Sequence, residues 1–168
     1  MGSVPDGDPV PPDGALPAGA LGTLGRQPFG IYVHVPFCLT RCGYCDFNTY
    51  TAAELGGAPR GSYADLAVAE IRLARRVLGA VDLPVSSVFF GGGTPTVLPP
   101  ADLGNILAAI GAEFGLVNGA EITTEANPET VTPERLVGFR EAGVNRLSYG
   151  VQSFRDDELQ RLSRLHSA

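Results

Sequence analysis

Short strand-like runs alternate with amphipathic helical patterns from Ile31 to Leu162, and this alternation limits the fold more than any other feature of the chain. It predicts four strands, each followed by a helix, over residues 31–35, 85–90, about 121–125 and 144–151. Strands that alternate with helices form parallel sheets with right-handed crossovers. We therefore expect an α/β fold of about four βα units.

Helix boundaries are marked by residues with known capping roles. Ser62, Thr132 and Ser153 are typical N-cap residues, Pro133 suits the first helical position, and Gly143 is typical of a helix end. The fourth helix, from Ser153 through Leu162, is followed by no fifth strand. With 168 residues the chain is too short for an eight-stranded barrel of about 250 residues. We expect a fragment of a longer chain, with the last strand exposing an unpaired edge.

The first 28 residues differ in composition from the rest. They hold six prolines and six glycines with few large apolar side chains. Such a segment buries too little surface to offset its ordering entropy. We predict a disordered Pro/Gly/Ala-rich leader over residues 1–28 and a folded part over residues 29–168.

Charge and cysteine content restrict the function and the compartment. Twelve basic residues against eighteen acidic ones give a net charge of −6, and no basic stripe is present, so a nucleic-acid partner is not expected. Three cysteines within eight residues do not form a disulfide framework, and the first residues have no basic or apolar targeting region. These features indicate a reducing, cytoplasmic compartment.

The three cysteines Cys38, Cys42 and Cys45 follow the first predicted strand directly. Loops at the carboxyl ends of parallel strands are where α/β folds place their sites. Three thiolates on one short loop can hold three irons of a [4Fe–4S] cluster and leave the fourth iron for a non-protein ligand. Two alternatives stay open: a zinc site completed by His34 or His166, and buried inert thiols.

Two further features follow the second and third strands. The run Gly91-Gly92-Gly93-Thr94 either lets backbone groups approach a ligand without Cβ obstruction or makes an ordinary turn. Glu125 ends the third strand, where a carboxylate can accept hydrogen bonds from the two hydroxyls of a ribose. Its alternative is a solvated loop acid.

Taken together, the motifs resemble the radical S-adenosylmethionine (SAM) superfamily, in particular the oxygen-independent coproporphyrinogen III oxidase group. The resemblance runs from about residue 30 to residue 168. It implies a partial (β/α)6 barrel in which a reduced [4Fe–4S] cluster passes one electron to the sulfonium of SAM. It rests on C-x₃-C-x₂-C with Tyr44 before the last cysteine, on residues 32–38, on Gly91 to Thr96, on Glu125 to Pro128 and on Asn145 to Phe154.

The resemblance also implies contacts for individual residues. Gly92, Gly93 and Thr94 match the contacts to the amino group and methionine part of SAM. The other positions that match SAM contacts are Glu125, Gln152, Arg164, Tyr32 and Tyr44. The alternatives are a polar loop end for Gln152, a solvated face for Arg164 and core packing for both tyrosines. Because Arg164 lies near the last residue, we expect little structure to hold it.

The residues after Cys45 separate two branches of this group. The decarboxylase branch has a further cysteine two positions on, whereas this chain has Asp46-Phe47. The Cys-Asp-Phe pattern resembles the HemW branch of heme chaperones, and coproporphyrinogen decarboxylation is the alternative. The resemblance implies heme as cargo, heme or porphyrin and heme-acceptor proteins as partners, and an electron donor such as flavodoxin or ferredoxin. Neither His34 nor His166 is identified as a heme ligand.

Overall fold

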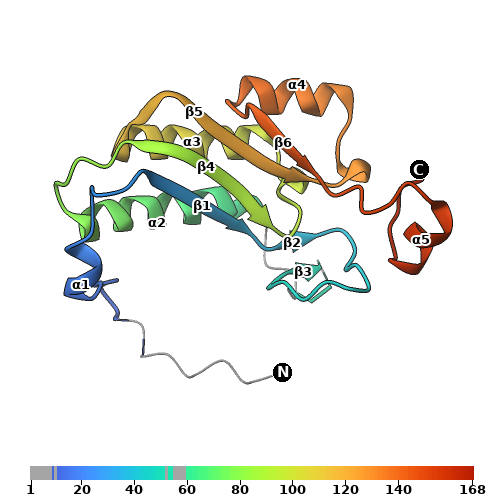
Figure 1. Cartoon of the computed structure of the whole chain (residues 1–168), viewed down its shortest axis with the longest axis horizontal. Helices are drawn as coiled ribbons and strands as arrows, with labels where there is room; N and C mark the ends of the chain where they lie inside the picture. Colours follow the sequence, from blue (N-terminus) through green and yellow to red (C-terminus); the bar gives the residue numbers. More distant parts are fainter. Residues whose placement is uncertain (1–8, 10, 52, 55–59) are drawn as a thin grey trace.

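A four-stranded parallel sheet forms the centre of the computed structural model, which describes residues 9, 11–51, 53–54 and 60–168. The strand order is β1-β4-β5-β6, and each neighbouring pair is parallel (Figure 1). This arrangement confirms the predicted α/β fold with a parallel sheet. The strands are β1 (Phe29–Val35), β4 (Val85–Gly92), β5 (Leu116–Ala126) and β6 (Arg146–Tyr149).

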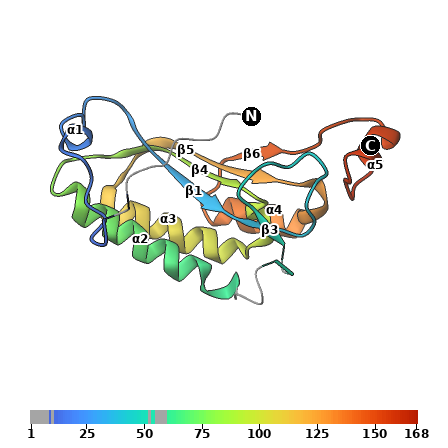
Figure 2. The same cartoon turned by 90° about the horizontal axis from the view of Figure 1, so that it is seen from below.

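Helices cover one face of this sheet. Helices α2 and α3 lie side by side against the strands, as Figure 2 shows. The α-helices are α1 (Ala18–Leu21), α2 (Tyr63–Leu78), α3 (Pro100–Phe114), α4 (Pro133–Glu141) and α5 (Asp156–Arg161). Short 3₁₀ turns are η1 (Arg60–Ser62), η2 (Pro95–Val97) and η3 (Pro128–Thr130). Within the described residues, no helix combines the length and apolarity needed to cross a membrane.

The core lies between the sheet and these helices. In β1, Val33 and Val35 are buried while Tyr32 points to the other face, as the alternation of a strand requires. Val33 pairs with Phe90 of β4, which is fully buried. On the helix side, Ile106 of α3 is also fully buried. The apolar residues that alternate along the strands and those that recur at helical spacing therefore pack together in one layer.

Several element boundaries differ from the predicted ones. Strand β6 is shorter than residues 144–151, and β5 begins at Leu116 because that residue pairs with Val85. Helix α5 begins only at Asp156, and its N-cap is Arg155, so the prediction of Ser153 as the N-cap is wrong. The Ser153 hydroxyl instead accepts from the Arg155 N–H at 3.1 Å. The caps of α4 are confirmed: Thr132 accepts from the Arg135 N–H at 3.3 Å, and Gly143 has a φ of +108°.

A second, two-stranded sheet was not predicted. Strands β2 (Phe37–Cys38) and β3 (Tyr50–Thr51) pair in parallel and enclose the cysteine loop. Two residues are too few to show a periodic pattern in the sequence. This small sheet fixes both ends of the loop that carries the three cysteines.

The predicted leader is only partly described. Residues 1–8 and 10 lie outside the described residues, so their disorder stays a prediction. From Pro11 onward the chain forms turns and helix α1, and Gly14 lies against α2, where an added Cβ would be 3.5 Å from the side chains of Leu73 and Val77. Leu24 packs against the core. The composition of this segment gave no indication of these contacts.

Candidate functional site

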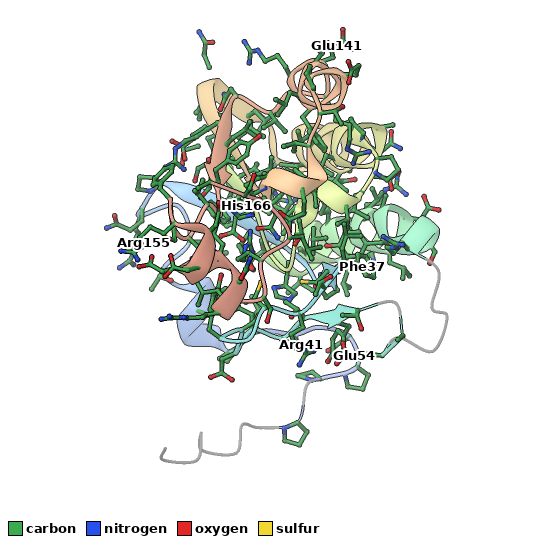
Figure 3. All side chains as sticks on the ribbon, turned by 90° about the vertical axis from the view of Figure 1, so that its right-hand side faces the viewer. Phe37, Arg41, Glu54, Glu141, Arg155 and His166 are labelled. Carbon is green, nitrogen blue, oxygen red and sulfur yellow. The ribbon has the colours of Figure 1, made fainter. Side chains whose placement is uncertain are left out.

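A pocket of about 400 Å³ opens where the parallel strands end. Figure 3 looks along the sheet toward this end of the molecule. The volume is in the range of sites for small organic ligands. All the predicted site residues except Tyr32 line it, namely Cys38, Cys42, Tyr44, Cys45, Gly92, Gly93, Thr94, Glu125, Gln152 and Arg164. Positions up to 126 residues apart in the sequence thus share one pocket.

The cysteine loop is held at its base and at its tip. At the base, Phe37 pairs with Tyr50, and the Arg41 guanidinium donates to the Thr49 carbonyl. At the tip, the Cys45 N–H donates to the Cys42 carbonyl at 3.1 Å, and the Gly43 N–H donates to the Leu162 carbonyl at 3.4 Å. The loop therefore rests on the residues that follow α5.

The three thiols influence one another electrostatically. Burial raises the pKa of the Cys38 thiol above its ordinary value, and negative charge on Cys45 and Cys42 raises that pKa further. Hydrogen bonds from the hydroxyls of Thr49 and Thr94 act in the opposite direction on the same pKa. Thiolates crowded in this way are stabilised by bound metal, whose positive charge compensates them. The donor set fits an iron–sulfur cluster.

The zinc alternative gains no support from the histidines. His34 Nε2 lies 2.8 Å from the Asn48 carbonyl, and its Nδ1 lies 2.9 Å from the Tyr32 hydroxyl. His166 Nε2 lies 3.0 Å from the Val151 carbonyl. In the part of the chain that the structure describes, no three His, Cys, Asp or Glu side chains are close enough together to hold a single metal ion.

The glycine loop lies next to the cysteine loop because the two backbones pair. Gly93 N–H donates to the Val35 carbonyl and Thr94 N–H donates to the Phe37 carbonyl, both at 2.8 Å. A Cβ on Gly93 would be 2.6 Å from the Phe37 oxygen. A Cβ on Gly92, whose φ is +107°, would be 2.5 Å from Cε1 of His34. The glycines are thus needed for packing against the protein itself, which differs from the reason expected from the sequence.

Polar side chains connect the loops after β4 and β5. The Gly92 N–H donates to Glu125 Oε2 at 3.0 Å, so Glu125 is not merely a solvated loop acid. The Asn127 amide donates to the Thr94 hydroxyl at 3.0 Å. Asn127 also lines the pocket, and the sequence analysis did not single it out. Its signal was its place two residues after Glu125, beyond the end of the strand. The sequence analysis also missed Ser148 and Tyr149, the last two residues of β6, and Gly150, which follows them, as lining residues.

Arg164 is buried and well supported, so the expectation that little would hold it is wrong, and so is the alternative of a solvated face. Its side chain is only 2% exposed. Its Nη2 donates to Asn127 Oδ1 at 2.8 Å and to the Gly150 carbonyl at 2.7 Å, and its Nη1 donates to Cys42 Sγ at 3.1 Å. Its Nε is buried with no hydrogen-bond partner. The positive charge of a guanidinium in the pocket lining suits an anionic ligand.

The two tyrosines and Gln152 occupy different places. Tyr32 is 57% exposed and lies outside the pocket lining. Partial burial is the larger cause that raises the pKa of Tyr32 above its ordinary value, and the negative charge of Glu125 is the smaller one. Tyr44 is 48% exposed and lines the pocket, so core packing is excluded for both rings. Gln152 has a φ of +68°, a strained conformation for a residue other than glycine. Such strain is concentrated at ligand sites.

Fold and pocket together define a class of protein. Three cysteine thiols, a glycine loop, a carboxylate and a buried guanidinium surround one pocket at the carboxyl ends of a parallel α/β sheet. Residues 32–168 match the family description "Radical SAM superfamily". The chain belongs to this superfamily, whose cofactors are a [4Fe–4S] cluster and SAM.

Individual relatives refine this placement. The chain is similar to the heme chaperone HemW of Mycobacterium tuberculosis (strain CDC 1551 / Oshkosh), with 47% identity over 88% of this chain and 37% of that protein. It is similar to the mitochondrial radical S-adenosyl methionine domain-containing protein 1 of Mus musculus, with 42% identity over 96% of this chain and 33% of that protein. The chain spans about a third of the length of these curated relatives.

A solved structure has the same fold. The coproporphyrinogen III oxidase HemN from Escherichia coli, described as a radical SAM enzyme, matches with a TM-score of 0.72 and 28% sequence identity. The match covers 88% of this chain and 34% of that one. This similarity agrees with the predicted partial barrel.

Proposed function

We propose that this chain is the N-terminal part of a HemW-like heme chaperone that binds a [4Fe–4S] cluster and SAM and acts in heme delivery. The observation that carries the proposal is the convergence of Cys38, Cys42 and Cys45 on one pocket with the glycine loop, Glu125 and Arg164. The 47% identity to a heme chaperone and the Asp46-Phe47 pair support this branch.

Each residue has a proposed task in this site. When bound, the cluster supplies one electron for reductive chemistry on SAM. The three cysteines hold three irons; Gly92, Gly93 and Thr94 bind the amino group and methionine part of SAM; Glu125 accepts from the ribose hydroxyls. Tyr32, Tyr44, Gln152 and Arg164 make the remaining SAM contacts. The protein contributes ligation, orientation and exclusion of water.

The setting of this function is also proposed. Residues 1–28 act as a leader and residues 29–168 as the first part of the radical SAM core. We place the protein in the cytoplasm, with heme or porphyrin, heme-acceptor proteins and an electron donor such as flavodoxin or ferredoxin as partners. The net charge of −6 disfavours a nucleic-acid partner.

The cluster is tested by anaerobic reconstitution followed by iron and sulfide analysis. We expect one [4Fe–4S] cluster per chain and its loss in each of Cys38→Ala, Cys42→Ala and Cys45→Ala, because a cluster with only two protein ligands is poorly held. Leu39→Ala is the control, since Leu39 lies in the same loop and is 52% exposed. Stoichiometric zinc without iron in the wild type, or a retained cluster in all three variants, would refute the assignment.

The second candidate function is coproporphyrinogen III decarboxylation, which the similarity to HemN favours. Heme titration followed by absorbance, with the M. tuberculosis relative as positive control, is set against a turnover assay with coproporphyrinogen III. We expect heme binding and no turnover. Decarboxylated product that accumulates over time would favour the second function.

A further inference from the structure

Behind the pocket wall lies a group of three charged or ionisable side chains, one buried and two partly buried, here called the triad: Glu129, Arg164 and His166. Their side chains are 18%, 2% and 9% exposed. Glu129 Oε2 lies 3.8 Å from Arg164 Nη2 and 3.5 Å from His166 Nδ1. His166 is labelled near the middle of Figure 3, at the carboxyl ends of the strands. The triad joins η3 to the residues that follow α5.

Polar atoms of the triad are incompletely paired. Glu129 Oε2, Arg164 Nε and His166 Nδ1 are all buried without a hydrogen-bond partner. A buried carboxylate is costly unless a positive charge compensates it, and among these contacts Arg164 is the permanent cation. The ion pair therefore favours the observed position of the guanidinium, in which Arg164 Nη2 lies 3.8 Å from Glu129 Oε2.

That position brings the guanidinium onto a proposed cluster ligand. Arg164 Nη1 lies 3.1 Å from Cys42 Sγ, while Nη2 is occupied by Asn127 and Gly150. A hydrogen bond to a ligand sulfur, together with a nearby positive charge, stabilises the more negative, reduced form of an iron–sulfur cluster. Arg164 would thus make the cluster easier to reduce.

We propose that Glu129 is a positioning residue that holds the Arg164 guanidinium against the Cys42 sulfur, and that this contact raises the reduction potential of the cluster. The inference rests on the proposed function, because it requires that Cys42 ligates the cluster. It concerns the one-electron couple between the oxidised and reduced cluster, in which no bond is made or broken and the electron comes from dithionite.

Glu129 offers a test in which two explanations predict opposite signs. If Glu129 acts only through its own charge, removing that negative charge favours the reduced cluster and raises the potential. If Glu129 acts by holding Arg164, removing it loosens the guanidinium from the sulfur and lowers the potential. The sign of the shift in Glu129→Gln therefore separates a positioning role from a through-space effect.

The experiment is a redox titration of the reconstituted chain, followed by electron paramagnetic resonance of the reduced cluster. We expect a lower potential in Glu129→Gln, a larger shift of the same sign in Arg164→Met, and a potential near wild type in Glu129→Asp. In the double variant Glu129→Gln/Arg164→Met the shift should equal that of Arg164→Met alone, because Glu129 acts through Arg164. Circular dichroism and iron content establish that each variant is folded and loaded.

Glu141→Gln is the matched control, since Glu141 is exposed and Figure 3 shows it at the end of α4, away from His166. We expect no shift in this variant. An unchanged or raised potential in a loaded Glu129→Gln chain would overturn the positioning role while leaving the proposed function intact. Failure of the wild type to assemble a cluster would instead refute the proposed function, and this inference with it.

Discussion

At the scale of single residues, the Glu125 carboxylate has two roles that can be separated. Its Oε2 accepts from the Gly92 N–H, and the side chain also lines the pocket. We expect Glu125→Ala to weaken SAM binding about 10- to 150-fold, because a hydrogen bond to a charged group contributes about 1.5–3 kcal/mol. Calorimetric titration of the cluster-loaded chain measures the dissociation constant.

Two controls make this prediction specific. Glu125→Gln keeps a carbonyl oxygen that can accept from Gly92, so it tests the charge with the loop contact retained. Glu121→Ala removes a carboxylate from the same strand that pairs with Arg146 at 3.6 Å and is absent from the pocket lining. If the dissociation constant for SAM is the same in Glu125→Ala as in the wild type, the carboxylate does not contribute to SAM binding, and its contact is the one with the Gly92 N–H.

Tyr63 makes the stability depend on pH in a defined window. Burial, followed by the negative charge of Glu70, raises the pKa of Tyr63 from 10.0 to about 12. The folded state thus favours the neutral phenol, whose hydroxyl donates to the His34 carbonyl at 2.6 Å. The contribution to stability is fully present below pH 10 and is lost as the pH rises through about 12.

Urea unfolding at a series of pH values checks this prediction. We expect the free energy of unfolding to fall more steeply between pH 10 and 12 in the wild type than in Tyr63→Phe, which has no phenol to ionise. Because the chain contains no lysine, no ammonium group titrates in the same window. Parallel curves for the two proteins would show that Tyr63 does not cause the dependence.

At the scale of elements, two helical glycines should respond differently to alanine. At Gly111 in α3 the nearest atom to an added Cβ is Leu116 Cδ1 at 3.9 Å, which is ordinary contact. We expect Gly111→Ala to stabilise the chain by about 0.5–1 kcal/mol, because alanine loses less backbone entropy in a helix. Urea unfolding measures the change.

Gly138 of α4 is the matched comparison. There an added Cβ would lie 3.0 Å from Cγ and 3.2 Å from Cβ of Pro100, the first residue of α3. The two helices must move apart to admit it, so we expect Gly138→Ala to gain less stability than Gly111→Ala or to lose some. Equal gains in stability at both positions would mean that α3 and α4 can move apart with no loss of free energy of unfolding.

At the scale of the whole molecule, β6 forms an open edge of the described sheet. It pairs with β5 alone, and its Leu147 and Tyr149 are 36% and 42% exposed. Unpaired strand edges with apolar side chains favour association with other chains. We expect the isolated chain to self-associate at rising concentration.

Size-exclusion chromatography with light scattering tests this expectation. Leu147→Lys should reduce self-association, because a charged side chain protects an edge strand. Leu66→Lys is the control, since Leu66 is 66% exposed on α2, which lies against β1 and not against β6. A monomer at every concentration tested would show that the β6 edge is protected.

The sequence by itself determined the elements that depend on neighbours along the chain. The alternation of βα units, the Thr132 cap and the Gly143 helix end were all predictable, because period and capping are local properties. The spacing of the three cysteines also indicated a cluster loop. The predicted strand boundaries were less accurate: β5 is longer and β6 is shorter than predicted, since the ends of a strand depend on its partner strand.

Only the tertiary structure decided what depends on groups far apart in the chain. Arg164 was expected to be poorly held, yet it is buried because Asn127, Gly150 and Cys42 surround it. The glycine loop is needed because His34 and the backbone of Phe37 lie against it. Spacing in the sequence carries no information on such contacts, because burial and charge pairing arise only when distant loops meet at the ends of the sheet.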